Sequence, residues 1–293
     1  MQQKLLAEYW QQSKTIIKEA SERTSPEFPT GLAFLDEVTG GFRRGEVWII
    51  AGKTSCGKTS LALNLARNFA ENPEHTILFC SLEMRGWELT LRLYCEMMEE
   101  NYSALITGVN KIDEVKEKIF VEFINNIDFD ISEAGYNFNE LLAIFDKFYK
   151  EKHPDVIFLD FIQLVEWREY GDERMALTEY IRKIKELANK YNIGFVVVSQ
   201  LRRLPSGADY QREPDLNDMK GSGAIEQYAD KCLLIYRQIE GDNVKHFINL
   251  AKNRQGQTIC KQVEFIGCQY KFKDFKPTPE AQNAKELMGG RYV

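Results

Sequence analysis

The stretch GKTSCGKT, residues 52–59, fits the pattern G-x-x-x-x-G-K-[ST] and follows the apolar run VWIIA. Glycines in such a turn let several backbone N–H groups converge on a phosphate, and the start of the following helix adds partial positive charge. The lysine neutralises the β- and γ-phosphates, and the hydroxyl after it holds Mg²⁺. We therefore predict an ATP and Mg²⁺ site formed by Gly52, Lys53, Thr54, Ser55, Cys56, Gly57, Lys58, Thr59 and Ser60.

Hydrolysis of a bound nucleotide needs two carboxylates in addition to this turn. Asp160 ends the apolar run VIFLD and has the position to hold the water shell of the metal. Glu83, in FCSLEM, is the candidate for the general base that orients the attacking water, and a solvated strand-end charge is the alternative. Gln200 closes VVVSQ at the edge where open α/β sheets bind ligands. From its position alone, the Gln200 amide either senses the γ-phosphate or caps the strand.

The elements that carry these residues alternate between apolar runs and amphipathic segments. The apolar runs predict strands within residues 42–52, 75–84, 154–165 and 193–200. The amphipathic segments predict helices at residues 87–100, 138–153 and 173–191. Because apolar strands separated by amphipathic helices form parallel sheets that are covered on both faces, we expect an α/β fold. Closely spaced strand-like segments at 231–239, 244–253 and 261–272 predict an antiparallel section near the C-terminus.

One α/β domain at residues 26–275 accounts for these elements, and two shorter segments flank it. Residues 1–25 predict an N-terminal helical arm, because their apolar side chains recur at helical spacing at Leu5, Leu6, Tyr9, Trp10, Ile16 and Ile17. Residues 276–293 are polar and predict a loosely ordered C-terminal tail.

The bulk composition excludes several classes of protein. The 293 residues are 44% hydrophobic and 28% charged, as in ordinary globular domains, and no apolar run approaches the roughly 18 residues of a membrane span. The N-terminus has no signal-peptide pattern, so we expect a cytoplasmic protein without a membrane partner. The six cysteines form no C-x-x-C pair, which favours free thiols. A net charge of −6 argues against a broadly basic nucleic-acid surface and leaves room for a local groove.

Longer segments of the chain resemble the DnaB-type replicative helicases. Residues 29–66 look like the entry to a RecA-like ATPase core, and SLEM, LDFIQLV, VVVSQLRR, PDLNDMKGSGAIEQYAD and KNRQGQT follow in the order of that family. The resemblance covers roughly residues 25–272. It implies a RecA-like P-loop NTPase, with a mostly parallel twisted sheet that is flanked by helices. It also implies an ATP-hydrolysing motor that forms a homo-hexameric ring, translocates on single-stranded DNA, unwinds duplex and works with replication or loader proteins.

The resemblance also implies roles for single residues. It makes Glu83 the catalytic base and Gln200 the γ-phosphate sensor, with Lys58 at the phosphates and with Thr59 and Asp160 at the Mg²⁺. The paired basic residues of the family, K-x-R, fall on Lys252 and Arg254, which would enter the nucleotide site of the neighbouring subunit as an arginine finger. KNRQGQ reads as a hairpin tip, which suits the projection of a charge outward.

The DNA-gripping loop of the family usually reads Leu-Arg-Glu-Ser-Gly, and MKGSG at residues 219–223 matches it here. A lysine replaces the arginine and a glycine replaces the acidic residue, so a phosphate contact is retained without the bidentate fork of a guanidinium group. Basic residues after Gln200 are further candidates. The predicted DNA-binding residues are Arg202, Arg203, Arg212, Lys220, Gly221 and Gly223.

The resemblance leaves an alternative function open. Family members normally carry a separate helical N-terminal domain that meets primase, whereas about 25 residues precede this core and match the linker helix that packs on the next subunit. The alternative is a RecA-fold ATPase that acts as a switch or assembly factor, of the recombinase or clock type, without strand separation. KNRQGQT and GSGAIEQ favour the helicase, and the acidic net charge keeps the switch open. A small-molecule kinase is disfavoured because no acceptor-binding segment is evident.

Overall fold

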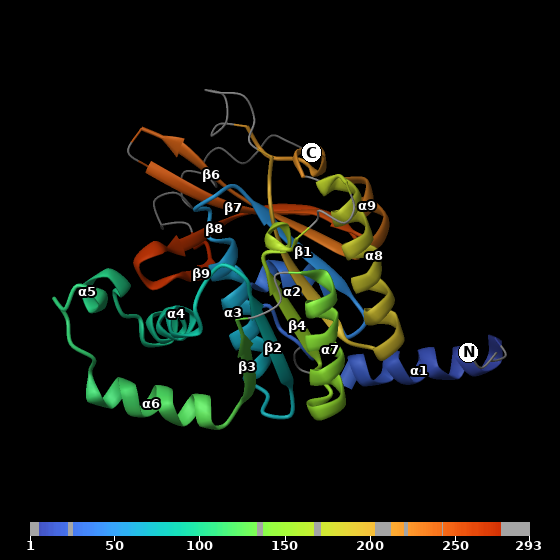
Figure 1. Cartoon of the computed structure of the whole chain (residues 1–293), viewed down its shortest axis with the longest axis horizontal. Coiled ribbons are helices and arrows are strands. Elements are labelled where there is room, and N and C mark those ends of the chain that lie inside the picture. The colour runs from blue at the N-terminus through green and yellow to red at the C-terminus, as the bar shows by residue number, and fades with distance from the viewer. Residues whose placement is uncertain are drawn as a thin grey trace, which may run out of the picture.

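The computed structural model describes residues 6–22, 26–133, 137–166, 171–202, 212–219, 222–241 and 243–276. One sheet runs through this part of the chain (Figure 1). Its parallel strands are β1 (Val47–Gly52), β2 (Thr76–Ser81), β3 (Asp128–Ser132), β4 (Val156–Asp160), β5 (Gly194–Gln200) and β6 (Lys231–Glu240). The antiparallel strands are β7 (Asn243–Asn253), β8 (Ile259–Ile266) and β9 (Lys271–Asp274). The order β3-β2-β4-β5-β1-β6-β7-β8-β9 confirms a mostly parallel sheet with an antiparallel C-terminal section.

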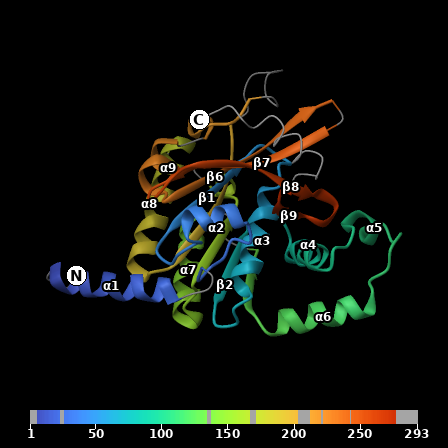
Figure 2. The same cartoon turned by 180° about the vertical axis from the view of Figure 1, so that it is seen from behind.

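Helices cover both faces of the parallel strands. On one face lie α2 (Ala33–Thr39), α3 (Lys58–Ala70) and α4 (Gly86–Met98). On the other face lie α7 (Phe138–Lys152), α8 (Glu173–Tyr191) and α9 (Ser222–Tyr228). Figure 2 shows the first of these faces, with α2 and α3 in front of the sheet.

The alternation of side chains along each strand explains why both faces are buried. On β1, Val47 and Ile49 pack in the core beneath α7 and α8, whereas Trp48 and Ile50 pack in the core beneath α2 and α3. All four side chains are fully buried. Successive side chains of a strand point to opposite faces of the sheet, so a strand that is apolar at every position contributes buried side chains to the cores on both faces. The continuous apolar runs of the sequence follow from this architecture.

The predicted long helix at residues 173–191 is confirmed at both ends. Asp172 is its N-cap, with a side chain that accepts a hydrogen bond from the Arg174 N–H, and Asn192 ends it in the left-handed conformation. The predicted strand at residues 154–165 is shorter than expected. β4 ends at Asp160, and the chain turns away into the 3₁₀ turn η1 (Ile162–Leu164). Likewise, the predicted strand at 261–272 is broken by η4 (Gly267–Gln269) into β8 and β9.

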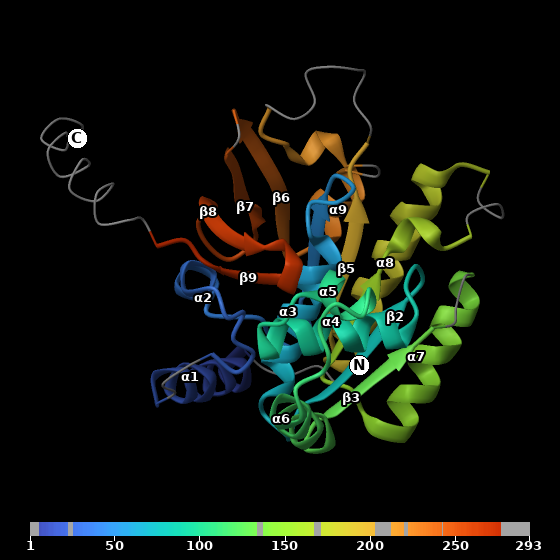
Figure 3. The ribbon, with the colours of Figure 1, turned by 90° about the vertical axis from the view of Figure 1, so that its left-hand side faces the viewer.

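Two helical parts extend from the body at opposite ends of the molecule. Helix α1 (Leu6–Glu22) lies at one end, and α5 (Tyr102–Ile106) and α6 (Glu114–Asn125) lie at the other (Figures 1 and 2). Figure 3 views the molecule from the side that carries α4, α5 and α6, and shows β7, β8 and β9 as a continuation of the sheet. Among the described helices, none combines the length and the apolar character that a membrane span requires. The short 3₁₀ turn η3 (Leu216–Asp218) precedes α9.

Candidate nucleotide site

The predicted phosphate-binding turn joins the end of β1 to the start of α3. A side chain at Gly52 would meet the carbonyl oxygen of Ile235 at 2.7 Å, so the backbone approaches β6 more closely than any other residue would allow. Gly57 has φ +91° and forms the N-cap of α3. These two glycines allow the turn to pass close to β6 and to enter α3, at whose N-terminus the helix dipole favours an anion.

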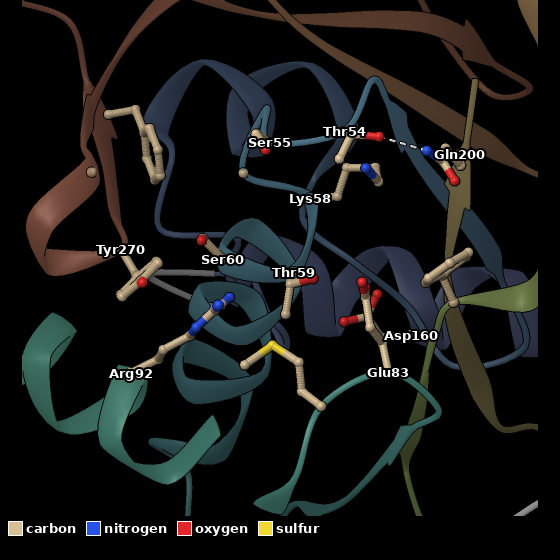
Figure 4. A pocket seen from close by; sticks show the side chains of 15 residues that line it. Thr54, Ser55, Lys58, Thr59, Ser60, Glu83, Arg92, Asp160, Gln200 and Tyr270 are labelled. Carbon is tan, nitrogen blue, oxygen red and sulfur yellow. Dashed lines mark hydrogen bonds between the residues drawn. The ribbon is translucent and has the colours of Figure 1, made fainter. Parts of the chain in front are cut away.

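A cavity of about 440 Å³ opens over this turn, and Figure 4 shows its side chains. The turn, the ends of β2, β4 and β5, helix α4 and the segment around η4 all contribute to it. The lining residues are Thr54, Ser55, Gly57, Lys58, Thr59, Ser60, Glu83, Met84, Arg92, Asp160, Phe161, Gln200, Phe265, Gly267 and Tyr270. Five residues to which sequence analysis gave chemical roles, Lys58, Thr59, Glu83, Asp160 and Gln200, are therefore brought to one place. Gly52, Lys53 and Cys56 do not line the cavity, and Cys56 packs instead into the core beneath α3.

Sheet register explains why the two carboxylates meet. β2 and β4 are neighbours, and Ser81 lies opposite Asp160 in the parallel ladder. Glu83 comes two residues after Ser81, so it extends past the end of β2 toward the same edge. In Figure 4 the carboxylates of Glu83 and Asp160 lie together, below Lys58 and beside Thr59. Glu83 is exposed, whereas Asp160 is 1% exposed.

Asp160 has the chemistry of a metal-site carboxylate. Its two oxygens are buried and have no hydrogen-bond partner within the described residues. Burial raises the pKa of this carboxyl to about 6, the negative charge of Glu83 adds to the rise, and Thr59 and Lys58 oppose it. A buried carboxylate next to a threonine hydroxyl offers hard oxygen ligands of the kind that Mg²⁺ binds together with water and nucleotide phosphates. The residues present therefore fit a Mg²⁺–nucleotide complex.

The side chains of Lys58 and Gln200 both form hydrogen bonds with the phosphate-binding turn. The Lys58 ammonium group donates a hydrogen bond of 2.9 Å to the carbonyl oxygen of Lys53. Burial lowers the pKa of Lys58, and the nearby Cys56, Asp160 and Glu83 counter this effect. The Gln200 amide donates a hydrogen bond of 2.6 Å to the Thr54 hydroxyl, as Figure 4 shows. A polar side chain at the end of β5 is thus in direct contact with the turn.

Sequence analysis missed an arginine and several aromatic residues of this cavity. The Arg92 guanidinium carbon lies 4.3 Å from the centre of the Tyr270 ring, a cation–π geometry. Phe265 stacks on Phe272 with ring centroids 4.4 Å apart. No local pattern marks these residues, because Arg92 lies in an amphipathic helix and Tyr270 lies within a segment that reads as a strand. Tyr270 lines the cavity because the chain turns at η4, and Arg92 does so because α4 packs beside that turn. Both depend on the tertiary fold.

The K-x-R residues lie outside this cavity, where β7 turns toward β8. Arg254 follows the end of β7, and its side chain is 52% exposed. The Lys252 side chain, unlike that of Arg254, is not directed outward. Its ammonium group points back onto the end of α9, where it donates to the carbonyl oxygens of Ile225 at 3.2 Å, of Ala229 at 2.6 Å and of Glu226.

Half of the predicted DNA-binding residues can be placed. Arg202 is exposed just after β5, and its backbone N–H donates to the carbonyl oxygen of Asp218 at 2.9 Å. Arg212 pairs with Asp215 at 3.5 Å and with Asp218, so its charge is already opposed by two carboxylates. Gly223 lies in the first turn of α9, where added side-chain atoms would meet nothing within 4 Å. Arg203, Lys220 and Gly221 lie outside the described residues.

A parallel strand, a phosphate-binding turn and a helix, with a carboxylate at the end of a second parallel strand, define a RecA-like P-loop fold. Solved structures support this fold. The ATPase domain of G40P superposes on this chain with a TM-score of 0.80 at 24% sequence identity, and the match covers 94% of this chain and 100% of that one. A DnaB-like replicative helicase, solved in work that also describes its interactions with primase, superposes with a TM-score of 0.78 at 24% identity, covering 89% of this chain and 67% of that one.

Residues 28–274 match the family model described as DnaB-like helicase C terminal domain. The chain belongs to this family. It is 29% identical over 250 residues to the replicative DNA helicase DnaC of Bacillus subtilis, covering 81% of this chain and 54% of that one. It is 31% identical over 245 residues to a probable plasmid replicative DNA helicase of Chlamydia trachomatis, covering 81% of this chain and 52% of that one. The chain therefore matches about half the length of these relatives.

Proposed function

We propose that this protein is an ATP-driven motor that translocates on single-stranded DNA and unwinds duplex, working as a homo-hexameric ring. The observation that carries the proposal is the convergence of Lys58, Thr59, Glu83, Asp160 and Gln200 on one cavity over a phosphate-binding turn. Each of these residues has the side-chain chemistry that one step of phosphoryl transfer to water requires. Membership of the DnaB-like family supports the coupling of this chemistry to DNA.

The cavity suggests a division of labour among its residues. The amides of the turn and the Lys58 ammonium group would hold the β- and γ-phosphates, and Thr59 and Asp160 would hold Mg²⁺, which would supply charge neutralisation at the transferring group. Glu83 accepts a proton from the attacking water, a role that its exposure at the cavity permits. Gln200 already contacts Thr54, so a nucleotide that displaces this contact would alter the end of β5.

We propose that each nucleotide site is completed by the next subunit. Arg254 lies outside the cavity of its own chain, half exposed at the β7–β8 turn, as a finger that acts in trans requires. Both side chains would first have to leave contacts within their own chain, Arg254 those with Asp230 and the Gln227 carbonyl oxygen, and Lys252 those with the carbonyl oxygens at the end of α9. An arginine finger that acts in trans makes assembly a condition of hydrolysis.

Two apolar surfaces support a head-to-tail ring. Helix α1 exposes Leu6, Tyr9, Trp10, Ile16 and Ile17, each at least 50% exposed. The α5–α6 part exposes Ile106, Val109, Ile112, Val115 and Ile119, also each at least 50% exposed. The two surfaces lie at opposite ends of the molecule (Figure 1). Contact between the first surface of one copy and the second surface of the next is heterologous, and such a contact forms a ring when the rotation between neighbouring copies closes on itself. We therefore assign residues 1–25 to an arm that binds the neighbouring subunit, beside an ATPase domain at 26–275 and a tail at 276–293.

DNA binding is assigned to the segment after β5. Arg202 is exposed there, and the segment 212–219 leads directly into Lys220 and Gly221. We propose that Lys220 contacts the DNA backbone and that Arg202 and Arg203 assist it. A cytoplasmic location and contacts with replication or loader proteins complete the proposal.

The experiment that tests this function compares ATP hydrolysis with and without single-stranded DNA, on protein whose oligomeric state is measured at the same concentration. DNA-stimulated hydrolysis by a hexamer-sized particle is the expected result. Lys58→Ala should abolish hydrolysis because the charge on the β/γ-phosphates is lost, whereas Lys150→Ala, on the outer face of α7 and 70% exposed, should not. A rate of ATP hydrolysis that does not change when DNA is added would instead favour a RecA-fold switch. Residual turnover in Lys58→Ala would refute the assigned phosphate site.

A further inference from the structure

The end of β5 lacks a neighbouring strand on one side. In β5 the backbone N–H groups alternate between its two neighbours, as Gly194 donates to Asp155 before β4 and Phe195 donates to Glu46 before β1, both at 2.8 Å. By this alternation the N–H and C=O of Gln200 face the side of β4. However, β4 turns away after Asp160, and its ladder with β5 extends only to Val197. An unpaired backbone group at that point would cost free energy.

The side chain of Gln163 takes the place of the missing strand. Gln163 lies in η1, and its Oε1 accepts a hydrogen bond of 3.1 Å from the Gln200 N–H. Its Nε2 donates to the Gln200 carbonyl oxygen at 3.2 Å and to the Ser199 hydroxyl at 2.7 Å. A glutamine amide has the same donor and acceptor as a peptide group, so it can pair with both sides of one backbone residue. Gln163 therefore extends the sheet by one residue through its side chain.

The strand end that Gln163 holds is connected to two functional regions. The Gln200 side chain donates to Thr54 in the phosphate-binding turn at 2.6 Å, and the Leu201 N–H donates to Gly52 at 3.3 Å. The next N–H, that of Arg202, donates to Asp218, two residues before Lys220. A movement of Gln200 would therefore shift groups in the phosphate-binding turn and in the segment that leads to the predicted DNA loop.

We propose that Gln163 is a positioning residue, which fixes Gln200 in register with the phosphate-binding turn through this side-chain pairing. The inference rests on the proposed role of Gln200 at the γ-phosphate. In this proposal Gln163 does not contact the nucleotide. It acts through Gln200 on the difference in affinity between a nucleoside triphosphate and a diphosphate. In Gln163→Leu the Gln200 N–H and C=O lose their partners while the volume of the side chain is nearly kept.

The first readout is local and does not depend on activity. Amide hydrogen exchange in a peptide that spans residues 197–202 should become at least about ten-fold faster at one amide in Gln163→Leu, because the Gln200 N–H is released. Gln163→Glu keeps the acceptor for that N–H and loses the donor to the carbonyl oxygen, so it should retain most of the protection. Unchanged exchange in Gln163→Leu would overturn the proposal.

The second readout is the affinity for ATPγS relative to ADP, measured with both Gln163→Leu and Gln200→Ala. Gln200→Ala should weaken ATPγS binding by about ten-fold and leave ADP binding within about two-fold, as expected for one lost hydrogen bond to a charged group. Gln163→Leu should weaken ATPγS binding in the same direction. The double variant should be no weaker than Gln200→Ala, because the two residues act in series.

Additive losses, or equal losses for ATPγS and ADP, would show a general structural role for Gln163 and overturn the proposal. Leu164→Ala, in the same 3₁₀ turn and 38% exposed, is the matched control and should bind both nucleotides as the parent does. Failure of the parent protein to bind ATPγS would refute the proposed ATPase function as well. A clear effect of Gln200→Ala together with none of Gln163→Leu would overturn the present inference and leave that function standing.

Discussion

Arg254 donates a hydrogen bond of 3.2 Å to the carbonyl oxygen of Gln227, near the end of α9. The same guanidinium group lies 3.5 Å from the carboxylate of Asp230, which also binds the N–H of Val47 at the start of β1 and the ammonium group of Lys185. Helix α9 begins just after Lys220 and Gly221, the predicted DNA loop. The candidate finger therefore contacts the end of a short helix whose start follows the predicted DNA loop directly in the sequence.

Arg254→Ala should lower the rate of ATP hydrolysis by about 10³–10⁵, the range of an arginine finger, while the subunit still binds ATP through its own Lys58. ATP binding by the variant is measured with a fluorescent nucleotide, and turnover by phosphate release. Lys245→Ala, near the other end of β7 and paired with Glu240, is the control and should keep turnover near that of the parent. Loss of nucleotide binding in Arg254→Ala would count against a finger role.

Mixing Arg254→Ala subunits with Lys58→Ala subunits should restore part of the ATPase activity. Each variant is inactive alone, but a mixed ring contains interfaces where an intact Lys58 meets an intact Arg254. Subunit exchange is followed independently with a fluorescent label on one variant. With exchange demonstrated, a complete absence of recovery would refute a site that is shared between subunits.

Glu83→Gln should preserve ATP binding and slow hydrolysis by about 10²–10⁴, the usual contribution of general-base catalysis. The amide is nearly isosteric with the carboxylate and cannot accept a proton from water. Single-turnover kinetics and equilibrium binding separate the two effects. Unchanged turnover at unchanged affinity would remove Glu83 from the mechanism.

Asp160→Asn should stabilise the free protein increasingly as the pH rises. Burial raises the pKa of the Asp160 carboxyl from 3.8 to about 6, so the folded state holds this proton more tightly than the unfolded state. Below pH 3.8 this carboxyl does not lower the free energy of unfolding of the wild-type protein. Between pH 3.8 and pH 6 that free energy falls as the pH rises, and above pH 6 the full loss is present. A rise of about two in pKa corresponds to about 3 kcal/mol.

The measurement is the free energy of unfolding in urea, for wild type and Asp160→Asn, at about pH 5 and about pH 8. The asparagine cannot ionise, so its advantage over wild type should be larger at the higher pH. A difference between the two proteins that stays constant with pH would contradict a buried carboxyl with a raised pKa at this position.

Lys220→Ala should weaken the binding of single-stranded DNA and flatten its salt dependence by about 0.7 in the log–log slope, because one phosphate contact is lost. ATP hydrolysis without DNA should stay near the wild-type rate. Arg212→Ala is the comparison, and its effect should be smaller because Asp215 and Asp218 already oppose the charge of Arg212. An equal loss of slope in both variants would contradict the assignment of the contact to Lys220.

Much of the fold could be predicted because its signals are local. The P-loop pattern, the continuous apolar runs and the capped helix at Glu173–Tyr191 all depend on residues close together in the chain. The positions of Asp160 and Glu83 also followed from strand ends alone. Arg92 and Tyr270 could not be predicted, because their meeting at 4.3 Å depends on how α4 packs against η4. The contacts of Lys252 could not be predicted for the same reason, since its carbonyl partners lie in and just after α9, 23 to 27 residues earlier in the chain.

Strand separation on a forked DNA duplex tests the motor most directly. The account predicts that the wild-type protein separates the strands when ATP and Mg²⁺ are present, at a concentration where it is oligomeric, and that Lys58→Ala does not. A fork with two single-stranded tails gives the ring an end on which to assemble without a loader. DNA-stimulated ATP hydrolysis without any strand separation on this substrate would contradict the helicase and favour an ATPase switch on the same fold.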